Sequence, residues 1–209
     1  LLYLYTKSIF ISNSDKEKNI KRFKDIKSNL ARTEITDNYG ILNYIKSSNI
    51  KIIFSLKKIE IKRLIEMSNK TNQFNSNYKR ISSKDVNKFS KDKSYKIVTF
   101  SVSDKYSDSG IIASLIIKNY HKYDAIIEFT MSCRALGRGL EYIFINLISK
   151  KFSIKDMRIN YIKTNKNEPF IKFAEKIKFK KDKTNYWINL KKIKKISENY
   201  EKYVKVKAN

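Results

Sequence analysis

The sequence is poor in cysteine, histidine, proline and glycine. It holds one cysteine (Cys133), one histidine (His121), one proline (Pro169) and four glycines among 209 residues. A single thiol excludes an internal disulfide, and one cysteine with one histidine leaves no Cys- or His-cluster metal site. The longest apolar run, 111–117, is interrupted by Ser114 and is far shorter than the roughly 20 residues of a membrane-spanning helix. We therefore expect a cytoplasmic globular protein without metal and without a membrane segment.

Acidic residues are also few, so the charge is strongly positive. There are 46 Lys and Arg against 20 Asp and Glu, a formal net charge of +26, and 39 of the basic residues are lysine. Nucleic-acid-binding proteins concentrate charge on one face and use arginine to contact bases and phosphates. Here lysine is enriched in every part of the chain, so we do not expect specific nucleic-acid binding. A polyanion-binding domain remains an alternative.

Hydrophobic spacing predicts two helices followed by a mixture of strands and helices. The first helices are expected at 15–31 and near 38–46. Strands are then expected at 50–56, 95–102, 110–117, 125–131, 157–162 and 185–190, and helices at 60–67, 84–89, 140–148 and 167–177. This order predicts an α/β fold with a mixed sheet, in which antiparallel hairpins come first and a crossover helix joins Met131 to Met157.

The most informative segment follows the strand that ends at Met131. There Arg134-x-x-Gly137-x-Gly139 opens an amphipathic helix. Two glycines let the backbone approach an anion, and the N–H groups at a helix N-terminus attract it. We call this segment the phosphate loop; its residues are Arg134, Ala135, Leu136, Gly137, Arg138 and Gly139. The alternative is a glycine-rich turn that binds nothing.

Four short motifs resemble those of FkbH-like proteins. They lie at 69–75 with 79–80 (KTNQFN…RR in the family), 103–110 (D-R/K-F-G-D-x-G), 131–141 (SCRxxGRGxE) and 164–169 (T-x-K-N-x-P). The order of strand, loop, helix, strand and helix around the phosphate loop is similar to that of the GNAT-like acyltransferase fold. Together these motifs cover about residues 40–180.

The resemblance implies a two-domain enzyme with an N-terminal HAD-superfamily phosphatase of subfamily IIIC and a C-terminal GNAT-like domain. Such proteins load a glyceryl unit, derived from 1,3-bisphosphoglycerate, onto an acyl carrier protein in polyketide or related biosynthesis. We expect residues 1–48 to be a helical connector from a missing phosphatase domain, 49–190 the GNAT-like acyltransferase domain and 191–209 a Lys-rich tail. The chain lacks the Asp-x-Asp nucleophile motif, so phosphatase activity is not expected from it.

Two residues are predicted to be catalytic. Cys133 is the candidate acyl-carrying nucleophile, because a thiol beside two arginines at a helix N-terminus has a reason to be a thiolate; a buried structural cysteine is the alternative. Asp108 is a candidate general base, with an Asx-type turn as its alternative. Phe74 is expected to anchor its loop to the core. The predicted substrate-binding residues are Asn72, Gln73, Asn75, Asp104 and Asn167.

These residues predict transfer of an acyl group, glyceryl according to the resemblance, to or from a phosphopantetheine thiol. The expected cofactor is CoA or carrier-bound phosphopantetheine, and the expected partners are an acyl carrier protein and the missing phosphatase domain. One alternative is a simple acetyl-CoA-dependent N-acyltransferase that does not use Cys133. Another is a non-catalytic carrier-protein docking module, whose basic surface meets an acidic partner.

Overall fold

A computed structural model of the chain describes residues 13–56, 60–77, 79–159, 161–182 and 185–208. Its helices are α2 (Asn13–Ser47), α3 (Ile61–Lys70), α4 (Ser83–Lys91), α5 (Leu140–Lys151), α6 (Glu168–Ile177) and α7 (Leu190–Glu201), with a 3-10 turn η1 (Cys133–Ala135). Its strands are β1 (Lys51–Ser55), β2 (Tyr95–Ser103), β3 (Asp108–Asn119), β4 (Asp124–Met131), β5 (Met157–Ile159), β6 (Lys178–Asp182), β7 (Asn185–Ile188) and β8 (Lys205–Ala208). The hydrophobic spacing predicts neither β6 nor β8.

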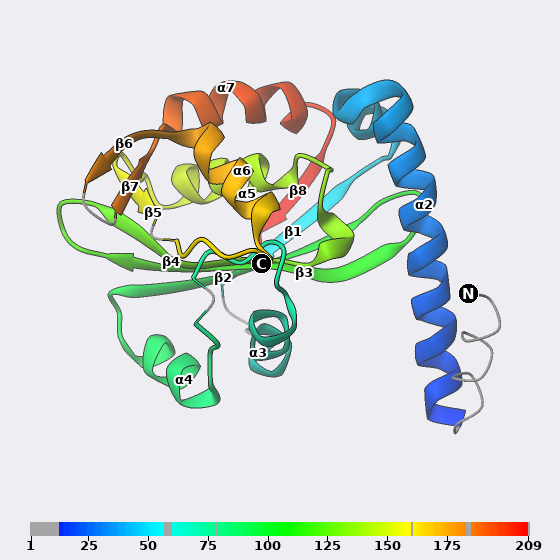
Figure 1. The fold of residues 1–209 in the computed structure, drawn as a ribbon, viewed down its shortest axis with the longest axis horizontal. Coiled ribbons are helices and arrows are strands. Elements are labelled where there is room, and N and C mark those ends of the chain that lie inside the picture. Colours follow the sequence, from blue (N-terminus) through cyan, green and yellow to red (C-terminus); the bar gives the residue numbers. More distant parts are fainter. Residues whose placement is uncertain (1–12, 57–59, 78, 160, 183–184, 209) are drawn as a thin grey trace.

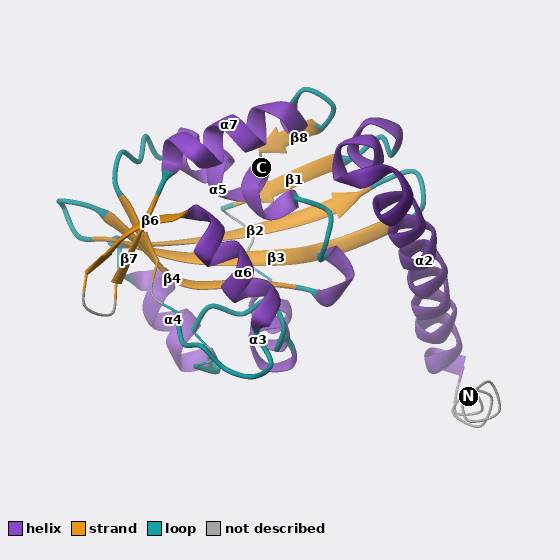
Figure 2. Cartoon of the chain, turned by 45° about the horizontal axis from the view of Figure 1, so that its top comes forward, coloured by secondary structure: helices purple, strands orange, loops and turns teal. Residues whose placement is uncertain are grey.

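The strands form one eight-stranded mixed sheet in the order β6-β7-β5-β4-β3-β2-β1-β8. The neighbours from β1 to β4 are antiparallel, whereas β5 is parallel to β4 and β8 is parallel to β1. Helix α5 is the crossover between β4 and β5. Helices α5, α6 and α7 cover one face of the sheet, and α3 and α4 lie on the other (Figures 1 and 2). The α/β class with a mixed sheet, predicted from the sequence, is confirmed.

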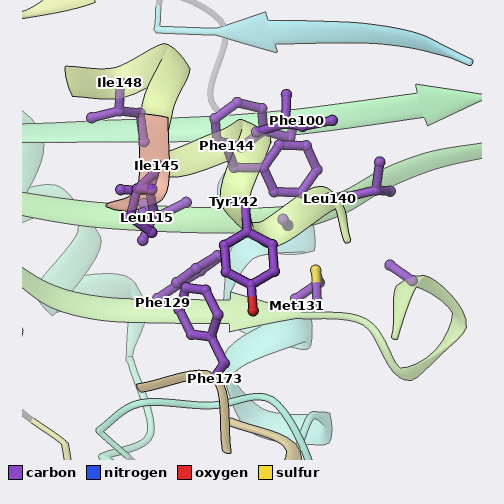
Figure 3. Close-up of a cluster of buried hydrophobic side chains, with 14 of the residues drawn as sticks. Phe100, Leu115, Phe129, Met131, Leu140, Tyr142, Phe144, Ile145, Ile148 and Phe173 are labelled. Carbon is purple, nitrogen blue, oxygen red and sulfur yellow. The ribbon is translucent and has the colours of Figure 1, made fainter. Parts of the chain in front are cut away.

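The main hydrophobic core lies between the sheet and α5 (Figure 3). Phe100 of β2 stacks on Phe144 of α5 with ring centroids 4.2 Å apart. Helix α5 buries residues around most of its circumference, including Asn146, because α7 covers the side that the sheet does not. A smaller apolar cluster under α3 and α4 is centred on Leu64, Val86 and Ile116.

The two N-terminal helices expected from the sequence are a single element, α2, with a break at Gly40 (φ 78°). Its second half contacts the core, where Tyr44 and Ile45 are fully buried. Its first half runs beside the ends of the central strands and extends beyond the sheet (Figure 1), and Phe23 and Leu30 are 69% and 68% exposed. The apolar spacing in the first half therefore predicts the helix correctly, but those side chains are not part of the core.

Residues 191–209, expected to be a Lys-rich tail, include most of α7 and all of β8. Ile193 of α7 is fully buried against the main core. Strand β8 extends the sheet beside β1, with Lys51 opposite Lys205. All six lysines of the two elements are exposed, and in β8 they alternate with exposed Val206 and Ala208.

Candidate anion-binding site

The phosphate loop lies between β4 and α5, as expected, and both of its glycines have left-handed backbone conformations. Gly137 has a φ of 74° and Gly139 a φ of 70°. Residues other than glycine adopt such positive φ angles only with backbone strain. A Cβ on Gly139 would lie 2.9 Å from the Tyr200 ring and 3.0 Å from Ile41, whereas one on Gly137 would meet nothing within 4 Å. Gly139 is therefore needed for close packing against α2 and α7, and Gly137 only for the turn.

Arg138, between these glycines, is 2% exposed. Its Nη2 donates to the side-chain oxygen of Asn29 at 2.8 Å and to the carbonyl of Arg134. Its Nη1 is buried and has no hydrogen-bond partner among the described residues; Asp104 Oδ2 lies 3.9 Å away. Burial lowers the pKa of Arg138, but a guanidinium remains charged at neutral pH. One nitrogen of a buried cation thus lacks an acceptor.

A second buried arginine comes from α2. Arg32 donates through Nε and Nη2 to both oxygens of Asp104, each at 2.7 Å, and the two side chains are 4% and 0% exposed. Asp104 also accepts from the Tyr44 hydroxyl at 3.0 Å and from the N–H groups of Tyr106 and Ser107. Burial alone would raise the pKa of Asp104, but these hydrogen bonds and the Arg32 charge outweigh it and hold the pKa below its ordinary value. Asp104, predicted to bind substrate, is therefore an ionised partner of Arg32.

Between α2 and the phosphate loop lies a cavity of about 90 Å³. It is lined by Asn29, Arg32, Thr33, Thr36, Cys133, Arg134, Leu136 and Arg138. Three arginines line it, and among the described residues the carboxylate near them is that of Asp104, which pairs with Arg32, so the described groups around the cavity are net positive. Hydroxyl and amide groups of α2 add neutral hydrogen-bonding groups. The cavity is well below the roughly 300 Å³ at which pockets for whole small molecules begin, so it fits one small anionic group.

Of the two predicted catalytic residues, only Cys133 lies at this cavity. Cys133 is exposed and lines it beside Arg134. Asp108 is exposed, lines no part of the cavity and accepts the N–H of Gly110 at 2.8 Å. This is the Asx-type turn that the sequence offered as its alternative.

The polar side chains of segment 72–77 make contacts within the protein. Asn72 accepts from Arg80 at 2.6 Å, and Gln73 is exposed while its carbonyl accepts the N–H of Phe170. Phe74 is 2% exposed and packs edge-on against Phe170, which agrees with its expected anchoring role.

Asn75 and Asn167 are both fully buried. Asn75 donates to the carbonyl of Ser68, and Asn167 donates to the carbonyls of Asn75 and Ile162. These two amides join segment 72–77 to the loop before α6. The structure does not bring them, Asn72 or Gln73 to the cavity beside Cys133.

Segment 74–76 also occupies the edge of β4 beyond the point where β5 ends. Among the described residues, strand β5 pairs with β4 as far as Ile126. Past it, the Ser76 N–H donates to the Phe129 carbonyl at 3.0 Å, and the Met131 N–H donates to the Phe74 carbonyl at 2.9 Å. The predicted substrate loop is thus part of the sheet edge.

The contribution of α2 is not predicted by the sequence motifs. Asn29 and Arg32 lie about a hundred residues before the phosphate loop, so no local motif includes them. The signal available was that Arg32 is one of only seven arginines in a lysine-rich chain. Two buried carboxyls, Glu128 and Glu141, are likewise not predicted by any motif, and burial raises their pKa values to about 7.

No metal centre or membrane-spanning helix is found in the part of the chain that the structure describes. None of its groups of His, Cys, Asp and Glu is large enough to hold a metal ion. No described helix is long and apolar enough to cross a membrane.

Comparisons with known proteins bear on the fold alone. No protein-family model and no curated protein sequence matches the chain. Among solved structures, the chain is similar to the crystal structure of a domain from Methanocaldococcus jannaschii DSM 2661, with a TM-score of 0.50 and 12% identity over 66% of this chain and 97% of that one. At this level of identity the likeness supports the α/β fold and assigns no activity.

Proposed function

We propose that this chain is a GNAT-like acyltransferase domain of the FkbH-like type, in which Cys133 carries an acyl group on its way to a phosphopantetheine thiol. The observation that supports the proposal is that Cys133, Arg134 and Arg138 line one cavity together with Arg32. A thiol nucleophile and a cluster of cations at one place are what transfer from an anionic acyl donor requires. The glyceryl identity of the acyl group and the carrier-protein partner come from the motif resemblance.

The small volume of the cavity limits which part of each substrate it can bind. At about 90 Å³ it admits one small anionic group. The phosphopantetheine arm is long, and its phosphate and thiol cannot both lie in so small a space. A short acyl phosphate, by contrast, has its phosphate beside the acyl carbon. We therefore propose that the cavity binds the phosphate of such a donor. The pantetheine thiol then approaches the exposed Cys133 from outside the cavity.

The two steps are substitutions at the acyl carbon. The Cys133 thiolate forms a C–S bond to this carbon, and the C–O bond to phosphate breaks, so that inorganic phosphate leaves. The pantetheine thiol then releases its proton to water, attacks the thioester carbon and displaces the Cys133 thiolate. Arg134 and Arg138 stabilise the negative charge of the donor and of the leaving phosphate.

Intact-mass analysis tests the covalent step. After incubation with 1,3-bisphosphoglycerate, the wild-type chain should gain the mass of one 3-phosphoglyceryl group, because only the acyl phosphate leaves and no phosphatase activity is expected from this chain. Cys133→Ser should gain none because a hydroxyl is not ionised near pH 7. Alkylation of Cys133 in the wild type by iodoacetamide is the control for an accessible thiol. If Cys133→Ser loads a carrier thiol as fast as the wild type, the covalent intermediate is wrong and transfer is direct.

A further inference from the structure

A second, larger cavity lies on the opposite face of the sheet. It measures about 340 Å³ and is bounded by α4, by segment 79–81 and by strands β2 to β4. It shares no lining residue with the cavity at Cys133. Its size falls within the range of pockets that bind small molecules.

Glu128 of β4 lies at this cavity because β4 contains a bulge. Ile116 of β3 pairs with Glu128, but Ile117 pairs with Ile126, so Ile127 is an extra residue. As a result Ile126 joins the main core, while Ile127 packs against the smaller cluster under α3 and α4 and lines the cavity together with Glu128. Bulges commonly redirect a side chain next to a functional site.

Glu128 is 3% exposed and has no cationic side chain bonded to it in the described residues. Its carboxyl accepts the Thr130 hydroxyl at 2.9 Å and shares a hydrogen bond with Ser68. Burial raises the pKa of Glu128 to about 7, although these hydrogen bonds and the Arg80 charge lower it. A carboxyl in such a site is partly protonated at neutral pH and can donate a hydrogen bond as well as accept one.

The remaining lining combines apolar walls with basic residues. Phe89 and Tyr95 stack with centroids 4.7 Å apart, and Ile127 adds an aliphatic surface. Lys79 and Lys88 line the cavity and are exposed, and neither is in an ion pair within the described residues. Arg80 and Asp85, which also line the cavity, have hydrogen-bond partners within the protein.

Arg80 donates to the carbonyls of Ser68 and Thr71, and Asp85 accepts from Ser82 in the N-terminal capping box of α4. The Asp85 carboxylate offsets part of the charge of Lys79 and Lys88, but Arg80 adds a third cation, so the charged side chains that line the cavity are net positive. A ligand for this cavity needs an anionic group for the two lysines, a flat or aliphatic body for the walls and a polar group for Glu128.

We propose that the cavity at Glu128 binds a small organic acid with an apolar body, whose carboxylate meets Lys79 and Lys88 and whose inner hydroxyl hydrogen-bonds to Glu128. This inference is independent of the proposed acyl transfer at Cys133. It concerns a different face, different residues and a different ligand group.

Calorimetric titration with two matched probes tests the proposal at pH 7. The first is 4-hydroxyphenylacetate, and the second is tyramine, which keeps the ring and hydroxyl but carries an ammonium. The wild type should bind 4-hydroxyphenylacetate at least tenfold more tightly than tyramine. Tighter binding of tyramine would overturn the proposal, because Glu128 would then act as the counter-ion of an amine.

Variants separate this cavity from the general attraction of a protein with a charge of +26 for anions. The double variant Lys79→Ser/Lys88→Ser should weaken 4-hydroxyphenylacetate binding at least tenfold, whereas Lys151→Ser/Lys166→Ser, which removes two exposed lysines elsewhere, should not. Glu128→Leu should also weaken it, with circular dichroism confirming the fold. Equal losses in both lysine pairs would overturn the site. Cys133→Ser should bind the probe like the wild type, whatever happens to acyl transfer.

Discussion

Arg138 uses only part of its hydrogen-bonding capacity inside the protein. Its Nη2 has two acceptors, but its buried Nη1 has none among the described residues. Burying a charged donor without an acceptor is costly, and the surrounding arginines increase the cost. An anion in the cavity would supply the acceptor. The side chain of Arg32, by contrast, pairs with Asp104, and this ion pair accounts for its burial without any ligand.

The ion pair between Arg32 and Asp104 should be important for stability. Arg32→Ala leaves a carboxylate that is 0% exposed without its main partner, and we expect a loss of about 3–5 kcal/mol in the free energy of unfolding. Lys172→Ala is the control, because it removes an exposed i,i+4 partner of Glu168 and should change stability little. Urea unfolding of both variants measures the difference. Similar small losses in the two would mean that α2 is not held by this pair.

Stability should fall as pH rises through neutrality because of Glu128 and Glu141. Both pKa values are raised by burial, from 4.5 to about 7, so between these values the folded state binds more protons than the unfolded state. Their contribution is therefore full below about pH 4.5 and is lost as pH passes 7, by on the order of 3 kcal/mol for each group. Asp104, whose pKa is lowered, titrates below this window.

Unfolding in urea at pH 5.5 and pH 8 checks this expectation. Glu128→Gln and Glu141→Gln should each reduce the loss of stability between the two pH values, while the exposed Glu168→Gln should leave it unchanged. A wild-type stability that rises over this range would contradict the assignment.

At the scale of elements, the two candidate sites occur where regular structure is interrupted. Helix α2 breaks at Gly40, β4 has its bulge at Ile127, and α5 begins after two left-handed glycines. Each interruption redirects a neighbouring segment. The glycines shape the loop beside Cys133, and the bulge turns Glu128 toward the second cavity.

The two glycines of the phosphate loop should differ in their tolerance of alanine. Gly137→Ala should lower the free energy of unfolding by about 1–2 kcal/mol, because the position is open and only the left-handed backbone is strained. Gly139→Ala adds a clash with Tyr200 at 2.9 Å and should cost roughly 1–3 kcal/mol more. Thermal unfolding of the two variants provides the comparison. If Gly137→Ala is the more damaging, α2 and α7 do not pack on this loop as the structure has them.

At the scale of the whole molecule, a charge of +26 on 209 residues disfavours the compact state through self-repulsion. Salt screens this repulsion between exposed lysines, so the melting temperature should rise between 10 and 150 mM sodium chloride. Phosphate at the same ionic strength should raise the melting temperature further in the wild type, because we expect it also to occupy the cavity lined by Arg138. Arg138→Lys should remove the extra phosphate effect and keep the chloride effect. Identical melting curves in phosphate and chloride for the wild type would argue against an anion site.

Local sequence determined the order of elements, because hydrophobic periodicity and glycine preferences act over a few residues. The helical spacing of Leu140, Ile143 and Phe144 predicts α5, and Gly137 and Gly139 predict the turn before it. The α/β class follows from the order of these elements. Cys133 could be connected with Arg134 and Arg138 because all three lie in one short segment.

Tertiary structure alone decided which distant groups meet. Arg32 and Asp104 are 72 residues apart, and their pairing depends on how α2 crosses the end of β2. The burial of Asn75 and Asn167 depends on segment 74–76 taking the edge of β4, and the position of Glu128 depends on the register between β3 and β4. Such contacts arise from the packing of whole elements, and a polar side chain's partner is not encoded in its neighbours along the chain.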